Sequence, residues 1–152
     1  YRYLADNHVP CLLYQGRYNL FNREPEEEGI LDQASKYGSG FVAFSPLAQG
    51  LLTGRYLDGI PDDSRIARGG HLKKEALTED VLRKIRDLNE IAARRGQTLA
   101  EMSLAWLLKD EKVASVIIGA SSVKQIDDNL KSLDNTSFCD EEICLINNVL
   151  SR

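Results

Sequence analysis

Two hydroxyl side chains lie where an apolar strand is expected to give way to a helix. Ser121 and Ser122 follow the apolar run 116–118 and precede the helical pattern 123–130. Ser122 and Gln125 have the spacing of a capping box, in which the serine oxygen accepts a bond from a backbone N–H and the glutamine reaches back. Unpaired N–H groups and hydroxyls at a helix N-terminus also attract anions. The pattern is typical of a structural cap and also of an anion-binding loop.

Three short apolar runs supply the strands that would position these serines. They cover residues 9–15, 41–44 and 113–118, and the first is continuous enough to predict a strand buried on both faces. Acidic residues precede the helical pattern between the first two runs, and Lys36 and Gly38 follow it. Alternating strands and helices predict an α/β fold with a parallel sheet and right-handed crossovers.

Helical patterns dominate the second half of the chain. Val81, Ile85, Leu88 and Ile91 fall on one face of a predicted helix that ends near Gly96. Residues 98–101, Thr-Leu-Ala-Glu, have the form of a capping box and predict the start of a second helix. Residues 140–151 repeat the apolar pattern and predict a last helix.

A long connection separates the second apolar run from these helices. Residues 45–77 contain five glycines together with Pro46 and Pro61, and a connection of this length inside a domain is usually functional or disordered. Ligands of parallel α/β proteins bind at the carboxyl ends of strands. Loops 45–56 and 119–125 follow consecutive predicted strands, and together they predict a site for a phosphate-bearing cofactor.

Composition excludes several other classes of protein. The formal net charge of −4, with no basic run longer than two residues, argues against nucleic-acid binding. No apolar stretch is long enough to span a membrane, and the start is no signal peptide. The 3 cysteines lack zinc or redox spacing, so we expect no metal site and a reducing, cytoplasmic location.

Three motifs resemble those of the aldo-keto reductase superfamily. They are YQGRYNLFNRE at 14–24, FSPLAQGLLTGRY at 44–56 and IIGASSVKQIDDN at 117–129. They are most similar to the branch that contains bacterial glyceraldehyde-3-phosphate-type reductases and β subunits of voltage-gated potassium channels. The resemblance implies a (β/α)8 TIM barrel that binds NADPH without a Rossmann domain. It further implies that residues 1–152 form one partial domain, the C-terminal part with strands six to eight, their helices and a C-terminal helix.

The resemblance also implies which residues contact the cofactor. Gln15, at the end of its strand, would hold the nicotinamide carboxamide and Phe44 would stack on the nicotinamide ring. The loop residues implied around the pyrophosphate and phosphates are Ser45, Pro46, Leu47, Gln49, Gly50, Arg55 and Arg65. Those implied around the adenosine half are Gly119, Ser121, Gln125, Asp128 and Asn129. Lys124 lies where some members bind the 2′-phosphate, so NADPH rather than NADH is the expected cofactor.

The catalytic residues of the family have no counterpart in this sequence. Its aspartate, tyrosine, lysine and histidine precede strand six, and His8 and His71 match no motif, so we expect both to be ordinary surface residues. We therefore predict no catalytic residue here and no reduction of a carbonyl by this chain alone. The chain begins at Tyr1 rather than at Met, and we expect it to be a piece of a longer reductase that acts on a small carbonyl substrate.

Two alternatives to a piece of a reductase stay open. The channel subunits of the same branch imply that this scaffold also serves as a non-catalytic interaction or assembly module. Three parallel strands would leave exposed barrel edges, and self-association of two chains through these edges would cover them. Sedimentation distinguishes a dimer from a monomer.

Overall fold

The computed structural model describes residues 1–57, 59–62, 64, 66–67, 69 and 74–151. Its centre is a parallel sheet of β1 (Leu13–Arg17), β2 (Gly40–Phe44) and β3 (Val113–Ile117), in the spatial order β1-β2-β3. The predicted parallel α/β arrangement is therefore confirmed.

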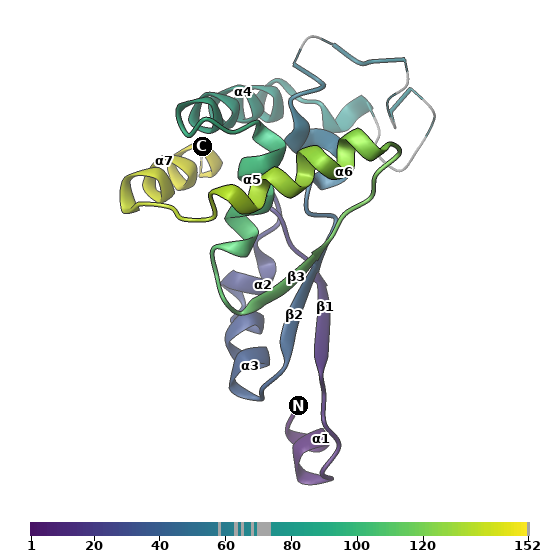
Figure 1. The fold of residues 1–152 in the computed structure, drawn as a ribbon, viewed down its shortest axis with the longest axis vertical. Coiled ribbons are helices and arrows are strands. Elements are labelled where there is room, and N and C mark those ends of the chain that lie inside the picture. Colours follow the sequence, from purple (N-terminus) through teal and green to yellow (C-terminus); the bar gives the residue numbers. More distant parts are fainter. Residues whose placement is uncertain (58, 63, 65, 68, 70–73, 152) are drawn as a thin grey trace.

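Helices and 3₁₀ turns connect and follow the strands (Figure 1). They are α1 (Arg2–Asp6), α2 (Glu24–Glu27), α3 (Ile30–Lys36), η1 (Ala48–Thr53), η2 (Lys74–Ala76), α4 (Glu79–Arg94), α5 (Leu99–Leu108), α6 (Val123–Leu130), η3 (Lys131–Asp134) and α7 (Asp140–Leu150). Figure 1 shows α2 and α3 beside the strands, while α4, α5, α6 and α7 gather at the far end of the molecule from α1.

Among the described residues, other elements cover one face of the sheet and leave the other largely open. Phe41 and Ala43 of β2 are fully buried, and Tyr18 meets the Phe41 ring edge-on at 6.0 Å between centroids. The alternate residues of β1, among them Leu13 and Gln15, are exposed. The prediction of a strand at 9–15 buried on both faces is thus wrong. The strand begins at Leu13 because Leu13 pairs with the first residue of β2, and it continues to Arg17 opposite Phe44.

The predicted helix between the first two strands is two helices. Gly29 lies between α2 and α3 with a φ of 71°, in the left-handed region that glycine adopts without a steric penalty. The N-terminal acidic residues therefore belong to α2, which buries Pro25, and α3 packs its Leu31 and Ala34 into the core.

Helix α5 lies at the centre of the core. Seven consecutive residues from 101 to 107 are buried, so this helix is enclosed on all sides. Its start confirms the predicted capping box. The Thr98 N–H donates to Glu101 Oε2 at 2.7 Å and the Glu101 N–H donates to Thr98 Oγ1 at 3.2 Å. The cap fixes where the helix begins, and this sets the position along the helix from which the Trp106 ring packs against Tyr18.

Arg95 ties the turn between α4 and α5 to the segment before α7. Its side chain is 2% exposed, and its Nη1 pairs with Glu142 Oε2 at 2.6 Å. Nη2 donates to the carbonyl of Ser137 at 2.9 Å, and the guanidinium lies 3.6 Å from the centroid of the Phe138 ring. Burial alone would raise the pKa of Glu142, but the Cys139 N–H and Arg95 lower it below its usual value. This cluster holds α7 against the rest of the fold.

We expect Arg95→Ala to lower the free energy of unfolding by about 2–4 kcal/mol, because it removes a buried charge with several hydrogen bonds and leaves their acceptors unpaired. Arg95→Lys keeps the charge but not the planar fork, and it should lose most of the same stability. Urea unfolding followed by circular dichroism measures both. The neighbouring Arg94, exposed at the end of α4, is the matched control, and equal losses for Arg94→Ala and Arg95→Ala would contradict the assignment.

No helix in the part of the chain that the structure describes is long and apolar enough to cross a membrane. Within the same residues, no group of three or more histidine, cysteine, aspartate or glutamate side chains is arranged to hold a metal ion.

Candidate cofactor site

The candidate site lies where the three strands end. Phe44, the last residue of β2, is opposite Arg17 on β1 and Ile117 on β3. Because the strands are parallel, the loop after β2 and the segment between β3 and α6 leave the sheet at this same edge. Phe44 and Ile117 keep exposed fractions of 36% and 47%, so an apolar surface is open beside both segments. The carboxyl ends of the strands therefore present the flat ring of Phe44 next to the polar backbone of the two loops.

The loop after β2 has an unusual backbone. Ser45, Ala48 and Gln49 have φ values of 54°, 46° and 59°, and Gly50 has 103°. For residues other than glycine this left-handed region costs on the order of 1–3 kcal/mol each, and such conformations gather at functional sites. Four residues of the six from 45 to 50 are in this region, which turns the chain sharply.

Buried side chains and hydrogen bonds hold this loop in place. Pro46, Ala48 and Leu52 are buried and anchor it, whereas Leu47, Gln49 and Gly50 are half-buried. The Gly50 N–H donates to the Leu47 carbonyl at 2.8 Å. The strained backbone therefore belongs to a packed loop.

Asn19 reaches this loop from the segment after β1. It is fully buried, and its Nδ2 donates to the Ser45 carbonyl oxygen at 2.9 Å. Asn19 is not among the residues predicted from the sequence, although it lies inside the motif at 14–24. The available signal was a polar residue two positions beyond a strand.

The prediction that Gln15 ends its strand is wrong. It is the middle residue of β1, opposite Val42, and its side chain is exposed. Since side chains alternate along a strand, Leu13, Gln15 and Arg17 share one face. Gln15 therefore lies on the same open face as Phe44, two residue pairs further from the strand ends.

At the start of α6 the two serines act with Gln125. Ser122 Oγ accepts from the Gln125 N–H at 3.3 Å, which confirms Ser122 as the N-cap. Gln125 Oε1 instead accepts from the Ser121 N–H at 2.8 Å and from Ser121 Oγ at 3.2 Å. The glutamine thus reaches one residue further back than a capping box requires. This arrangement fixes the segment before α6 while Ser121 and Gln125 stay exposed.

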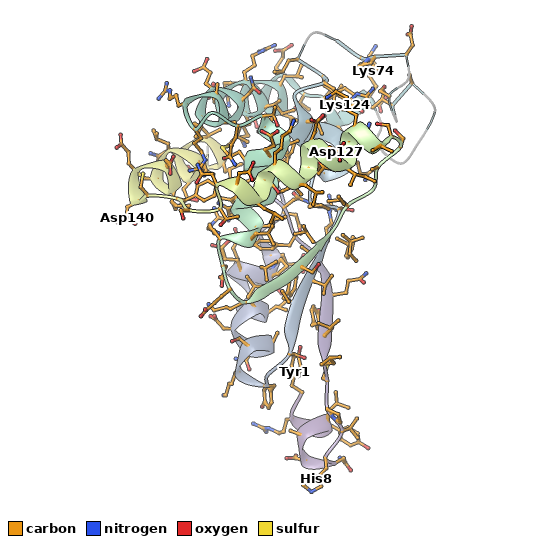
Figure 2. All side chains as sticks on the ribbon, in the orientation of Figure 1. Tyr1, His8, Lys74, Lys124, Asp127 and Asp140 are labelled. Carbon is orange, nitrogen blue, oxygen red and sulfur yellow. The ribbon has the colours of Figure 1, made fainter. Side chains whose placement is uncertain are left out.

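Asp128 is held between two lysines. Its carboxylate oxygens pair with Lys124 Nζ at 2.5 Å and Lys131 Nζ at 2.8 Å. These hydrogen bonds lower the pKa of Asp128, so it is a carboxylate at neutral pH. Asn129 is half-buried beside it and Gly119 is exposed before the helix. Lys124 is itself 82% exposed and labelled at the upper end of the molecule in Figure 2.

The remaining residues singled out in the sequence lie in the long connection and near the N-terminus. Arg55 is exposed just beyond η1, and Arg65 and His71 lie outside the described residues. His8 is exposed at the opposite end of the molecule from Lys124 (Figure 2). His8 therefore cannot act at the strand ends where the loops meet.

A charged and aromatic network supports the segment after β1. The Tyr18 hydroxyl donates to Glu26 Oε2 at 2.9 Å, and Arg23 Nη2 pairs with Glu26 Oε1 at 2.7 Å. Burial and the neighbouring Glu26 raise the pKa of Tyr18, so its hydroxyl stays protonated. For Glu26, burial alone would raise the pKa, but the bonds from Arg23 and Tyr18 lower it. Tyr18 is buried and thus packs as part of the core.

Parallel strands with helical connections and polar loops at their carboxyl ends define a parallel α/β protein. A model of the aldo/keto reductase family matches residues 2–151. This chain belongs to the aldo/keto reductase family.

Relatives and solved structures agree with this assignment. The chain is 49% identical over 142 residues to an L-glyceraldehyde 3-phosphate reductase of Escherichia coli O157:H7, covering 91% of this chain and 41% of that protein. A probable voltage-gated potassium channel subunit beta of Oryza sativa subsp. japonica is 43% identical, covering 83% of this chain and 39% of that protein.

Two solved enzymes have a similar fold. The glycerol dehydrogenase of Gluconobacter oxydans superposes with a TM-score of 0.79 at 25% identity, covering 99% of this chain and 46% of that chain. A thermostable aldo-keto reductase in complex with epalrestat gives a TM-score of 0.67 at 26% identity, covering 97% of this chain and 43% of that chain. This chain thus spans less than half the length of the proteins it matches.

Proposed function

We propose that this chain is the NADPH-binding part of an aldo-keto reductase barrel and corresponds to strands six to eight. The observation that carries the proposal is that two structured segments leave the sheet together at the carboxyl ends of its strands. One is the left-handed loop 45–50 and the other is the serine-capped start of α6, with the exposed Phe44 ring at the same edge. An elongated ligand with an aromatic end and an anionic middle fits this arrangement.

The side chains and backbone groups at this site are of the chemical types that bind the parts of such a cofactor. Phe44 offers a flat apolar face for a nicotinamide ring, and Gln15 offers an amide on the same face of the sheet. Backbone N–H groups of a tight turn and of a helix N-terminus bind phosphate oxygens. The N–H groups of Ala48 and Gly50 already donate within the loop, so a phosphate would bind to others of its N–H groups. Ser45, Pro46, Leu47, Gln49, Gly50 and Arg55 form the middle of the proposed site, and Gly119, Ser121, Gln125, Asp128 and Asn129 form the adenosine end. Arg65 is outside the described residues and is not part of this proposal.

When bound, NADPH supplies a hydride for reduction of a carbonyl to an alcohol. The residues of this chain would bind and orient the cofactor. Ser121 and Gln125 already satisfy each other, so a ligand there must either accept from the remaining Gln125 amide N–H or replace the internal bond. Lys124 is an exposed ammonium on α6 that pairs with Asp128, and it would favour a phosphorylated ribose over an unmodified one if it exchanged that pair for the phosphate.

The proposal is tested by titrating NADPH into the purified chain and following the nicotinamide fluorescence. We expect saturable binding that Gln125→Ala weakens, because this change frees the segment before α6. Asp127→Ala, an exposed change on the same helix, is the matched control. Absence of saturation in a chain shown to be folded by circular dichroism would contradict the proposal.

We further propose that the chain alone does not reduce carbonyls, because no residue in the site matches the proton donor of the family. NADPH consumption with a small aldehyde above the buffer blank would overturn this statement. In the complete reductase the substrate would be a small aldehyde or ketone, and a cytoplasmic location remains a prediction.

A second candidate is an interaction module, favoured by the surfaces this chain leaves open. Val123, Ile126, Leu130 and Leu133 are exposed at spacings of three and four along α6 and η3. No described strand pairs with the outer edge of β1 or of β3. Self-association through these edges stays a prediction, and a monodisperse monomer in sedimentation would exclude it.

A further inference from the structure

We infer that Asn19 is the positioning residue that holds the loop after β2 in its left-handed conformation. This inference rests on the proposed function for the importance of that loop. The contact itself is independent of any ligand.

Asn19 joins two segments that are far apart in the chain. Its Nδ2 donates to the Ser45 carbonyl at 2.9 Å, across 26 residues of sequence. Its Oδ1 accepts from the N–H groups of Phe21 and Asn22, at 3.0 Å in each case. Both polar atoms of this fully buried side chain are therefore used, Oδ1 in two bonds within its own turn and Nδ2 in one bond to the loop.

The acceptor of this bond is the first strained residue of the loop. Ser45 has a φ of 54°, and its carbonyl oxygen also accepts from the Ala48 N–H at 3.0 Å. A serine leaves this conformation readily unless its surroundings oppose the change. If Ser45 returned to an ordinary φ, its carbonyl would turn away from the two donors. Asn19 thus adds a bond that only the left-handed conformation satisfies.

The turn that carries Asn19 is rigid enough to serve as an anchor. Asn19 and Asn22 exchange backbone hydrogen bonds of 3.1 and 3.0 Å. The neighbouring residue Tyr18 donates to Glu26 at one side, and Arg23 pairs with Glu26 and donates to Asn147 of α7 at 2.6 Å on the other. A donor held from both sides restrains its acceptor, so the position of the loop depends on the packing of α2 and α7.

Asn19→Asp separates the two roles of the side chain. The carboxylate keeps an acceptor for Phe21 and Asn22 but places an oxygen, instead of a donor, against the Ser45 carbonyl. We expect amide hydrogen exchange of Ala48 and Gly50 in the 152-residue chain to rise about tenfold, the effect of losing one hydrogen bond of this kind. Exchange in α4 should stay unchanged. The control is Ser103→Ala, which removes another buried side-chain bond, from Ser103 Oγ to the Leu99 carbonyl.

A second variant keeps the inference testable if Asn19→Asp loosens the whole fold. Ser45→Gly makes the left-handed φ cheap, so adding it to Asn19→Asp should restore protection at Ala48 and Gly50. An increase of exchange at Ala48 and Gly50 that Ser45→Gly fails to reverse would overturn the inference. NADPH titration of the unchanged chain reports on the proposed function separately, because the exchange experiment contains no cofactor.

Discussion

Trp106→Ala is expected to lower the free energy of unfolding by about 3–5 kcal/mol, the cost of truncating a large buried aromatic side chain. Trp106 is 1% exposed and lies near the middle of the core. Its ring packs against Tyr18 at 5.4 Å between centroids, with the Arg23 guanidinium at 5.2 Å and Lys109 Nζ at 3.9 Å from its own centroid. Since domains have a total stability of about 5–15 kcal/mol, this variant should be close to unfolding.

Trp106→Phe distinguishes the packing of the ring from its polar edge. The indole Nε1 has no hydrogen-bond partner among the described residues, so phenylalanine loses volume without breaking a bond. We expect a clearly smaller loss for Trp106→Phe than for Trp106→Ala in urea unfolding. Lys109, whose ammonium lies over the Trp106 ring, is itself partly buried. This burial lowers the pKa of Lys109, although the carboxylates of Glu26 and Asp110 act in the opposite direction. A loss below about 1 kcal/mol for Trp106→Ala would contradict the central place given to this ring.

Phe44→Ala is expected to weaken NADPH binding by about 10- to 100-fold, because stacking of a ring on an aromatic side chain contributes about 1–3 kcal/mol. Phe44 has the exposure required, and its position at the end of β2 places it beside both loops. Phe44→Tyr keeps a flat ring and should retain most of the affinity. The measurement is the same fluorescence titration, carried out on each variant.

Leu13→Ala is the matched control for Phe44. Leu13 is a large apolar residue that is 54% exposed. It is the first residue of β1, at the opposite end of the sheet from Phe44. It shares the open surface of the sheet but lies far from the loops after the strands. Equal losses of affinity for Leu13→Ala and Phe44→Ala would mean that the cofactor does not stack at the strand ends.

Locally encoded features could be predicted from the sequence. The runs at 41–44 and 113–118 match β2 and β3 closely because each is apolar and bounded by polar or glycine residues. The box of Thr98 and Glu101 formed as predicted, since both bonds connect residues three apart. The parallel order follows from the alternation of strands and helices.

Features that depend on distant partners could not be predicted in this way. The bounds of β1 are set by pairing with β2, and the apolar content of residues 9–15 carries no information about this register. Ser45, Ala48 and Gln49 adopt left-handed backbone although their residue types do not favour it, and the bond to Ser45 comes from Asn19. Gln125 bonds Ser121 instead of completing the box on Ser122, a choice between two adjacent N–H groups.

The most direct test of the proposed site is a backbone amide NMR spectrum of the isotope-labelled chain titrated with NADPH. We predict that the amides of 45–54 and of 119–125 shift together with one dissociation constant. The chemical shifts of the amides in α1 and α7 should not change, and these amides serve as internal controls. Shifts confined to other parts of the chain, or no shift in a folded chain, would contradict the proposal that these two segments form one cofactor site.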